Sequence, residues 1–348
     1  MDPSTLREMN IKFAPLNIPL ERRLQTLAIV AYVIILILGV STSIAISLYV
    51  LLYTEYVRWI YLGYLTWIFF DLNSRERGGR PKQWVRKWLW WKYLADYFPV
   101  HFIKLPSCEL DPKKNYLLCC FPHGMMATGA FVSIATEARD ISKKFPNHKI
   151  HMHTLKTNFV FPLLRELVLS LGLVSSSAES LNYILGRPEG GNLTALVIGG
   201  AQEAFYTKPH QYKLVLRNRK GFIKVALRNG SPLVPVMSFG EPDILSQVDF
   251  GDGSLLRRFQ LAVKEYFGFV PIVPLGRGIF QYSFGLLPRR KEIAVVVGEP
   301  IDVVKSEKPT QEQIDNLHHE FITKLTQLFE TEKKNYLKNY EKIHLEIV

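Results

Sequence analysis

The chain has 348 residues, and its 43 Lys and Arg residues against 31 Asp and Glu residues give a net charge of +12. Such a surface attracts nucleic acid, anionic lipid or a phosphorylated substrate. Nucleic acid is the weakest of the three, because no zinc-ligand pattern or nucleic-acid motif accompanies the charge. The cysteines, Cys108, Cys119 and Cys120, form an odd, clustered set that excludes a disulfide framework and is typical of a reducing compartment.

The N-terminal part of the chain carries a strong membrane signal. Residues 1–23 form a polar tail, and residues 24–54 contain no charged side chain. That run exceeds the roughly 20 residues that a helix needs to cross a bilayer, whereas the next uncharged run, 59–70, is too short to cross as a helix. Because basic residues flank both ends of this region, the positive-inside rule places both flanks in the cytosol. The pattern predicts a membrane hairpin over residues 24–70, either as two crossings or as a re-entrant segment.

The position of the bend in this hairpin stays open. Gly39 with the small polar residues 41–43 marks one candidate break, and the charged stretch 55–58 marks another. Residues 71–110 are basic and aromatic, and directly after a membrane segment this composition predicts a position on the headgroup surface. A single soluble domain is predicted over residues 111–348, since the length that remains after the membrane segment suits one large globular domain.

The soluble domain begins with a strand, a tight turn and a helical pattern. The apolar run 116–121 is interrupted by Pro122, His123 and Gly124, and a helix is predicted from residue 125 to about 143. This order delivers one side chain to the C-terminal edge of a parallel sheet. Imidazole accepts protons near neutral pH, and a helix N-terminus beside it disfavours imidazolium. His123 is therefore the candidate general base, and a turn with a polar tip is the alternative.

Strands and helices alternate along the rest of the domain, which predicts an α/β fold. A helix is expected over 162–173, and a C-terminal helix is expected after a capping box of Thr310 and Gln313. Its apolar stripe from Ile314 to Leu328 indicates core packing. Buried strands are expected over 193–198, 231–240 and 293–297.

The strand 193–198 leads into further candidate site residues. It ends at Gly199 and Gly200, which allow a ligand or another backbone to come close. Glu203 follows, and it is the candidate for orienting His123 or binding an acceptor. The alternative is a carboxylate that only complements a helix N-terminus.

Four cations surround a glycine in the next turn, a pattern that suits a phosphorylated ligand. A solvated basic turn is the alternative. Arg165 and Glu166, in the helix expected over 162–173, are predicted to be structural, as an internal salt bridge. The four cations are Arg217, Arg219, Lys220 and Lys224.

Two other chemistries are weighed and not favoured. His151 and His153 have a spacing that can ligate a metal from a strand, but no carboxylate or cysteine lies at a supporting spacing, so no metal is expected. Cys119 or Cys120 as a covalent acyl carrier is a rival mechanism. Both lie inside an apolar strand, where thiols are usually inert.

An ordered set of short motifs resembles the diacylglycerol acyltransferase type 2 family, which includes monoacylglycerol and wax-alcohol acyltransferases. One such motif would be a weak signal, whereas the set in order over nearly the whole chain is specific. The motifs are FPHG at 121–124, ATEA at 135–138, PLLRE at 162–166, GGAQE at 199–203, the block 217–241 that ends at Glu241, the block 276–288, and VGEPI at 297–301.

The chain departs from the family pattern at one position. The first histidine of the family's His-Pro-His-Gly is Phe121 here, whereas the second, His123, is kept. Related lysophospholipid acyltransferases pair a single histidine with an aspartate five positions on, and Thr128 occupies that position. Because deprotonation of an alcohol requires one base, we expect His123 to suffice and Phe121 only to change the pocket wall.

The resemblance implies a mixed sheet flanked by helices, lysophospholipid-acyltransferase-like, with an N-terminal membrane hairpin. It implies transfer of a fatty acyl group from acyl-CoA, a substrate and not a cofactor, to a hydroxyl of mono- or diacylglycerol. Backbone N–H groups near Gly124 would hold the oxyanion, and the four cations would bind the coenzyme A phosphates.

The implied location is the endoplasmic reticulum membrane, with lipid droplets as an additional site. Partners are then acyl-CoA, acylglycerol and the bilayer, without nucleic acid, and a homo-oligomer stays open. The alternatives are a wax-alcohol acyltransferase and a non-catalytic lipid-binding or lipid-droplet scaffold, the latter motivated by Phe121.

Overall fold

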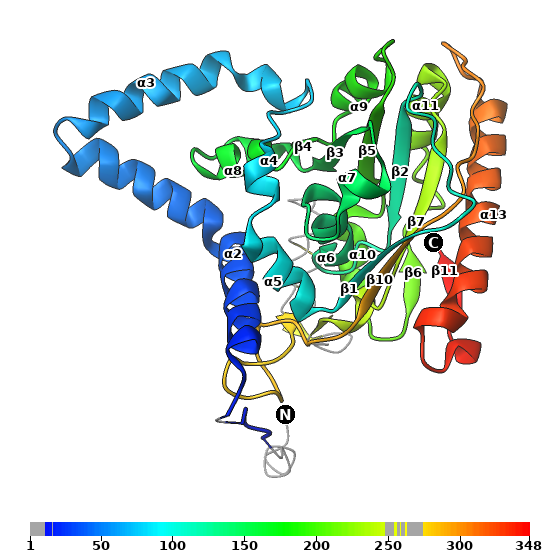
Figure 1. Cartoon of the computed structure of the whole chain (residues 1–348). Helices are drawn as coiled ribbons and strands as arrows, with labels where there is room; N and C mark the ends of the chain where they lie inside the picture. Colours follow the sequence, from blue (N-terminus) through cyan, green and yellow to red (C-terminus); the bar gives the residue numbers. More distant parts are fainter. Residues whose placement is uncertain (1–10, 16, 248–253, 256–257, 259–261, 263–273) are drawn as a thin grey trace.

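A mixed sheet forms the centre of the molecule (Figure 1). The computed structural model describes residues 11–15, 17–247, 254–255, 258, 262 and 274–348. The strands of the sheet are β1 (Val100–Lys104), β2 (Tyr116–Phe121), β3 (Lys149–Thr154), β4 (Leu173–Ser175), β5 (Asn192–Val197), β7 (Leu233–Phe239) and β10 (Ile293–Val297). Among the described residues their order is β1-β10-β7-β2-β5-β3-β4, and neighbours are parallel except for the antiparallel pair β10 and β7. The predicted mixed α/β sheet is confirmed.

Two short ribbons lie outside the central sheet. β6 (Tyr212–Leu214) pairs in parallel with β11 (Leu345–Ile347), and β8 (Ser246–Gln247) pairs with the antiparallel β9 (Pro274–Leu275). The helices of the domain are α4 (Gln83–Arg86), α5 (Leu89–Tyr97), α6 (Thr128–Ala130), η2 (Phe131–Ala135), α7 (Ile141–Lys144), α8 (Leu164–Ser170), α9 (Ala178–Leu185), α10 (Gly200–Tyr206), α11 (Gly221–Asn229) and α13 (Gln311–Tyr336). Short helical turns are η1 (Leu72–Arg75), η3 (Lys156–Phe159), η4 (Glu241–Asp243) and η5 (Tyr340–Lys342).

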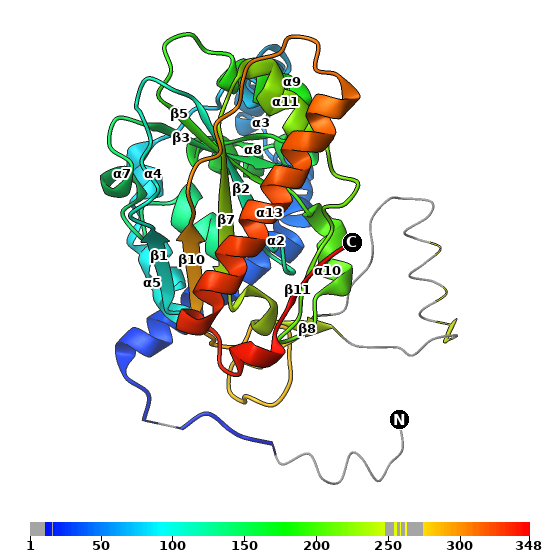
Figure 2. The same cartoon turned by 90° about the vertical axis from the view of Figure 1, so that its right-hand side faces the viewer.

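The central strands are buried on both faces, so their side chains divide between two apolar cores. In β2, Leu118 and Cys120 belong to the core that contains α5, whereas Leu117, Cys119 and Phe121 belong to the core beneath α13. Figure 2 shows α13 crossing the face of the sheet in front of β7. Burial on both faces explains why β2, β7 and β10 appear as continuous apolar runs in the sequence.

The C-terminal helix is confirmed in detail. The Gln313 N–H donates to Thr310 Oγ1 at 3.2 Å and the Thr310 N–H donates to Gln313 Oε1 at 2.9 Å, which is a complete capping box at the start of α13. The apolar stripe is buried, with Phe321 and Leu325 fully enclosed. This stripe is core packing, as predicted.

The long helix expected from residue 125 to about 143 is wrong. Helical structure covers only α6 and η2, and the chain is irregular until α7. Two contacts end the helix: Thr136 Oγ1 donates to the Val132 carbonyl and accepts the Ala138 N–H, and the buried Arg86 donates to the Ile134 carbonyl at 3.1 Å. A side chain that bonds the local backbone competes with the next helical turn, and sequence periodicity does not show this.

The uncharged N-terminal run forms one continuous helix, α2 (Leu20–Tyr53), followed by α3 (Val57–Phe70). The chain turns between them at 54–56, so the helix is interrupted next to the charged stretch and runs unbroken through Gly39, the other candidate. Gly39 lies near α8, since a Cβ there would be 3.6 Å from Leu164 Cδ1, an ordinary packing distance.

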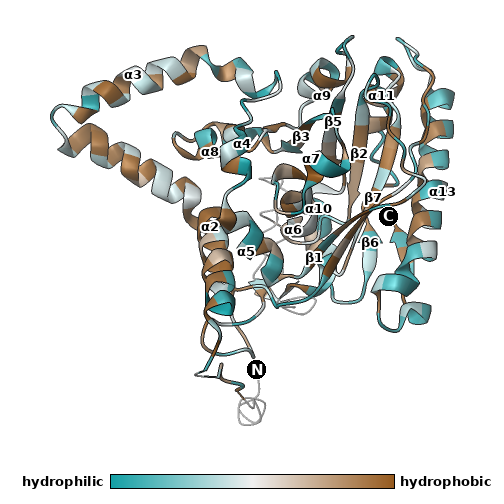
Figure 3. Cartoon of the chain, in the orientation of Figure 1, coloured by the Kyte–Doolittle hydropathy of each residue, from teal (hydrophilic) through white to brown (hydrophobic). Residues whose placement is uncertain are grey.

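Within the described part of the chain, α2 is the one helix long and apolar enough to cross a membrane. Its first third packs against α5 through Ala28, Ile29 and Val33, whereas most of its later residues are exposed. Figure 1 shows that α2 changes direction partway along and that its later part and α3 project from the domain as a V, and Figure 3 shows that both arms are predominantly hydrophobic. This arrangement is consistent with a membrane protein. The domain boundaries drawn from the sequence stay predictions.

Candidate active site

His123 lies in the turn that follows β2, at the C-terminal edge of the sheet. The turn depends on glycine: Gly124 has a φ of +55°, and a Cβ there would lie 2.9 Å from Glu241 Cγ. The side chain of His123 is half-buried and lines a cavity of about 1020 Å³. The predicted placement of one histidine at this sheet edge is therefore confirmed.

The imidazole is oriented by its own turn. His123 Nδ1 lies 3.0 Å from the Gly124 carbonyl oxygen. Because a carbonyl only accepts, Nδ1 carries the ring hydrogen and Nε2 keeps its lone pair. Burial lowers the pKa of His123 below its usual range, and the hydrogen bond to Gly124 opposes this effect only in part. The neutral imidazole is thus the dominant form at neutral pH, as a base requires.

Glu203 holds the backbone of His123, not its ring. Glu203 Oε2 accepts the His123 N–H at 2.6 Å, and Oε1 accepts the Val215 N–H at 2.9 Å. The predicted direct orientation of the imidazole by Glu203 is thereby corrected. Gly199 makes room for this carboxylate, since a Cβ at Gly199 would overlap Glu203 Cδ at 1.8 Å. Burial raises the pKa of Glu203 to about 7, against the two N–H donors.

Glu241 supports the other end of the same turn, a role that the sequence did not indicate. Its oxygens accept the N–H groups of Thr128 and Gly129, each at 2.8 Å, at the start of α6. Burial raises the pKa of Glu241 to about 7, and the two N–H groups oppose that increase. A carboxylate directly after a buried strand was the available signal, because a charge there needs partners. Two buried carboxylates therefore fix the turn that presents His123.

The cavity joins an apolar wall to a cationic one. Its apolar wall comes from α2 and α8, through residues such as Leu36, Val40 and Leu167. Its polar wall contains Arg219 and Lys220 at the N-terminus of α11. A volume near 1000 Å³ is at the upper end of the usual range for small-molecule sites. The cavity suits a long amphiphile with an anionic end.

The four predicted cations are divided by the structure. Arg219 and Lys220 line the cavity, where Arg219 Nη2 donates to Gln202 at 3.2 Å and Lys220 Nζ lies 2.7 Å from Asp315. Arg217 and Lys224 lie outside the cavity lining. Arg217 Nη2 donates to the Ile347 carbonyl at 3.2 Å, whereas Lys224 is exposed. Phosphate binding by this group stays a prediction.

Phe121 does not change the pocket wall, so that expectation is wrong. Its side chain is fully buried beneath α13, with its ring centroid 6.1 Å from that of Phe321, and the described cavity lining does not include it. Phe121 is the last residue of β2 and points into the core beneath α13, whereas His123 belongs to the turn that follows the strand and reaches the cavity. The family's first motif histidine would therefore lie in an apolar core in this chain.

The rival chemistries find no support in the geometry. All three cysteines are buried, and burial raises the pKa of Cys120 to about 12 and that of Cys119 well above its usual value. Such thiols resist ionisation, which argues against a covalent acyl carrier. His153 Nδ1 donates to the Ser175 carbonyl at 2.6 Å and Nε2 accepts from Thr194 at 2.8 Å, so both nitrogens are engaged. The described residues contain no cluster of potential metal ligands.

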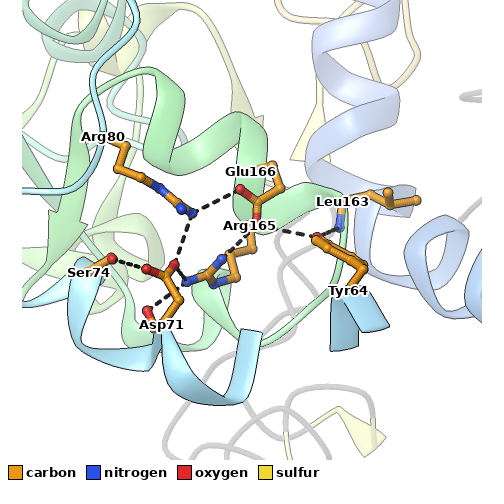
Figure 4. Close-up of polar contacts among 7 residues, drawn as sticks. All are labelled: Tyr64, Asp71, Ser74, Arg80, Leu163, Arg165 and Glu166. Carbon is orange, nitrogen blue, oxygen red and sulfur yellow. Dashed lines mark hydrogen bonds and ion pairs between the residues drawn. The ribbon is translucent and has the colours of Figure 1, made fainter. Parts of the chain in front are cut away.

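Arg165 and Glu166 form a buried ionic network with the end of α3, as Figure 4 shows. Arg165 is 1% exposed and donates to both the carboxylate and the carbonyl of Asp71. Arg80 lies 3.0 Å from Asp71 and from Glu166, which also accepts from Tyr64. The predicted internal salt bridge between Arg165 and Glu166 is confirmed. The network extends to Tyr64 and Asp71 of the α3 region. It ties α8, a wall of the cavity, to the projecting helices.

Fold and site together define an α/β domain in which one histidine base faces a partly apolar cavity. The family model described as diacylglycerol acyltransferase matches residues 49–347. The chain is 43% identical over 328 residues to human 2-acylglycerol O-acyltransferase 1, a match that covers 94% of this chain and 97% of the relative. It is 41% identical over 318 residues to human diacylglycerol O-acyltransferase 2, covering 91% and 81%. The chain belongs to the diacylglycerol acyltransferase family.

Among solved structures, the chain is similar to the 1-acyl-sn-glycerophosphate acyltransferase PlsC of Thermotoga maritima. The TM-score is 0.42 at 11% sequence identity, and the match covers 90% of this chain and 97% of that chain. A likeness this distant supports no conclusion about this chain.

Proposed function

We propose that this protein transfers a fatty acyl group from acyl-CoA to a hydroxyl of mono- or diacylglycerol, making di- or triacylglycerol. Its family and its acylglycerol O-acyltransferase relatives support this reaction class. One observation carries the proposal: His123, a neutral base with a free Nε2, faces a cavity with an apolar wall and a cationic wall. An acyl-CoA thioester requires an apolar wall for its long acyl chain and a cationic wall for its anionic carrier, and the acceptor hydroxyl requires the base.

The chemistry needs one base. Nε2 of His123 takes the hydroxyl proton while the alcohol oxygen forms a bond to the thioester carbon. The tetrahedral intermediate then collapses, the C–S bond breaks, and the imidazolium returns its proton to the leaving thiolate. The N–H groups of Gly124, Met125 and Met126 donate to no acceptor within the described residues, so they are the candidate oxyanion donors.

The donor's phosphates belong at the cationic wall. Arg219 and Lys220 stand beside the N-terminus of α11, where the helix dipole adds to their charge. Arg217 and Lys224 add positive potential from outside the cavity lining. No metal or cofactor takes part in the proposed reaction, since acyl-CoA is itself the activated substrate.

The apolar arms α2 and α3 suit a hairpin that enters the membrane from one face. The mostly exposed part of α2, from Ile34 to Tyr53, has 20 residues, whereas α3 has 14 and is too short to cross. Because α2 also lines the cavity, substrates that partition into lipid would reach His123 directly from the bilayer. The endoplasmic reticulum and lipid droplets are the proposed locations.

An acyltransferase assay on microsomes that contain the full chain tests this function. Labelled oleoyl-CoA is offered with monoacylglycerol, diacylglycerol or hexadecanol, and His123→Ala is compared with His101→Ala, a matched change at an exposed histidine in β1. We expect product from the wild type and from His101→Ala, and a loss of about 10²–10⁴-fold in His123→Ala.

Each other outcome has one meaning. Full activity in His123→Ala at equal abundance overturns the base assignment. A folded wild type that makes no product with any acceptor overturns the function and favours the scaffold. Product from hexadecanol alone identifies a wax-alcohol acyltransferase.

A further inference from the structure

The loop between β9 and β10 exposes a set of large apolar side chains that the proposed reaction does not use. Phe280 is 79% exposed and Leu286 is 55% exposed, and Phe13 beside them is 72% exposed. The same loop also exposes Ile279, Tyr282 and Phe284. These six residues are called the aromatic loop surface. Apolar side chains gathered in this way mark an interaction site.

Hydrogen bonds within the loop hold these apolar side chains in their exposed positions. Gln281 Oε1 accepts the N–H groups of Ser283 and Phe284 at 2.8 and 3.1 Å, and the Gly276 N–H donates to the Gly285 carbonyl at 2.7 Å. A Cβ at Gly276 would lie 1.9 Å from the Leu287 carbonyl oxygen, so the loop folds this way only with glycine there. The backbone therefore fixes the apolar tips outward.

The loop is also attached to the start of α2. The Ala14 N–H donates to the Phe280 carbonyl and the Tyr282 N–H donates to the Lys12 carbonyl, each at 2.8 Å. Arg290, at the end of the loop, donates to Gln25 of α2 at 2.5 Å. In Figure 1 the loop accordingly lies beside the base of α2.

An exposed apolar line on α2 connects this surface to the projecting arm. Leu20, Leu27 and Ile34 are 71%, 56% and 49% exposed and follow one another at seven-residue spacing, which places them on one face of the helix. This line is one exposed apolar side of the helix whose start is attached to the loop. Lys12, which precedes α2, and Arg22 and Arg23 in its first turn are also exposed.

We infer that the aromatic loop surface is a second membrane contact, which inserts its apolar tips at the headgroup level of the bilayer that receives the α2 and α3 arms. Aromatic side chains favour that level, and cations beside them attract anionic headgroups. The domain is then held at two places, by the hairpin and by this surface. Two contacts fix the tilt of the domain, whereas a hairpin alone would leave it free to rotate.

Depth-dependent fluorescence quenching on the full chain tests the inference without using catalysis. The native cysteines are buried, so a single introduced cysteine accepts an environment-sensitive thiol dye. Phe280→Cys is the test position, and Val304→Cys, 87% exposed between β10 and α13, is the matched control. Ile60→Cys on α3 is the positive control. The labelled proteins are reconstituted in phosphatidylcholine and phosphatidylserine vesicles that carry a spin label near the headgroup or deep in the acyl chain.

We expect several-fold stronger quenching at position 280 than at position 304, and a shallow label that quenches position 280 better than a deep one. Quenching at position 280 no greater than at position 304, while position 60 responds, overturns the inference. A dye at position 280 whose emission follows the protein-to-lipid ratio and not the spin label indicates that a second copy covers the surface, which also overturns it. The acyltransferase assay can fail without affecting any of these outcomes.

Discussion

Two polar clusters flank the cavity, and they stabilise charged side chains that are removed from water in different ways. At the His123 turn, the carboxylates of Glu203 and Glu241 are held by backbone N–H groups. At the start of α8, Arg165 and Asp71 neutralise each other, with Arg80 and Glu166 beside them. One cluster stabilises its charges with dipoles and the other with opposite charges.

The difference appears in how the carboxylates titrate. Burial raises the pKa of Glu203 and of Glu241 to about 7, so their ionisation near neutral pH is unfavourable. Burial acts the same way on Asp71, but the hydrogen bonds from Ser74 and Arg165 and the charge of Arg80 outweigh it and lower its pKa. Asp71 in the α8 cluster therefore stays ionised across neutral pH, whereas Glu203 and Glu241 at the turn change protonation near pH 7. Shifted carboxylates of this kind gather where chemistry occurs.

Removal of Arg165 is expected to have the largest effect on stability. Arg165→Ala removes the fully buried member of the network, while the partly exposed Asp71 keeps Arg80 and Ser74. We therefore expect a loss of stability below the roughly 3–5 kcal/mol that breaking a fully buried pair costs. We expect a lower thermal unfolding temperature in detergent micelles and a looser α8. Arg165→Lys keeps the charge but loses the two-pronged contact, so it should fall between. Equal stability of wild type and Arg165→Ala would show that α8 is anchored elsewhere.

Loss of a turn carboxylate is expected to lower activity more than stability. Glu203→Gln keeps one acceptor oxygen but presents an amide NH₂ to an N–H donor, so the backbone of His123 shifts. A displacement of about 1 Å at a reacting group lowers kcat by about 10²-fold. Glu241→Gln should act in the same direction, whereas Glu179→Gln, an exposed carboxylate in α9, should change nothing. A normal kcat in both turn variants would separate the carboxylates from catalysis.

A polar side chain placed in the apolar core without a hydrogen-bond partner should destabilise the fold, since both clusters bury polar groups only with partners. Phe121→His introduces the family's first motif histidine, but position 121 is fully buried against Phe321 beneath α13. Burial of an unsatisfied polar group costs about 1–3 kcal/mol. We expect lower stability and no gain in activity, measured as unfolding temperature and kcat. A gain in kcat would show that the imidazole reaches the cavity.

The pH dependence of kcat/KM is the smallest expected effect that distinguishes the turn carboxylates from the α8 cluster. Burial lowers the pKa of His123 below its usual range, so its protonation does not limit activity near pH 7. Glu203 and Glu241 do take up protons there, and a protonated carboxyl holds N–H donors less well. We expect kcat/KM to fall as pH drops through about 7, and this fall to move to lower pH only in the double variant Glu203→Gln with Glu241→Gln, because either carboxyl alone still takes up a proton there.

Stability should change in the opposite direction over the same range. A carboxyl whose pKa is raised on folding binds protons more tightly in the folded state, so the free energy of unfolding decreases as pH rises from about 4.5 to about 7. Asp71, with a lowered pKa, adds stability that is lost only in more acidic solution. If the fall in kcat/KM stays near pH 7 in the double variant Glu203→Gln with Glu241→Gln, another group causes it.

The sequence by itself determined the periodic and local features of this protein. Apolar runs gave the buried strands β5, β7 and β10 to within two residues, a capping box gave the start of α13, and the absence of charge gave α2. The ordered motifs identified the family, and strand, turn and glycine placed His123 at a sheet edge. These features follow from neighbours in the chain, so periodicity and turn chemistry show them.

Only the tertiary structure decided how distant residues meet. Glu203 and Glu241 reach the backbone of the His123 turn from separate elements, and Gly39 lies near α8 without interrupting α2. The helix expected after the turn ends early because Arg86, far away in sequence, takes one of its carbonyls. Phe121 lies outside the cavity because the pleat of β2 turns it toward α13. Hydrogen-bond partners and strand faces are set by packing, and no local pattern in the sequence encodes them.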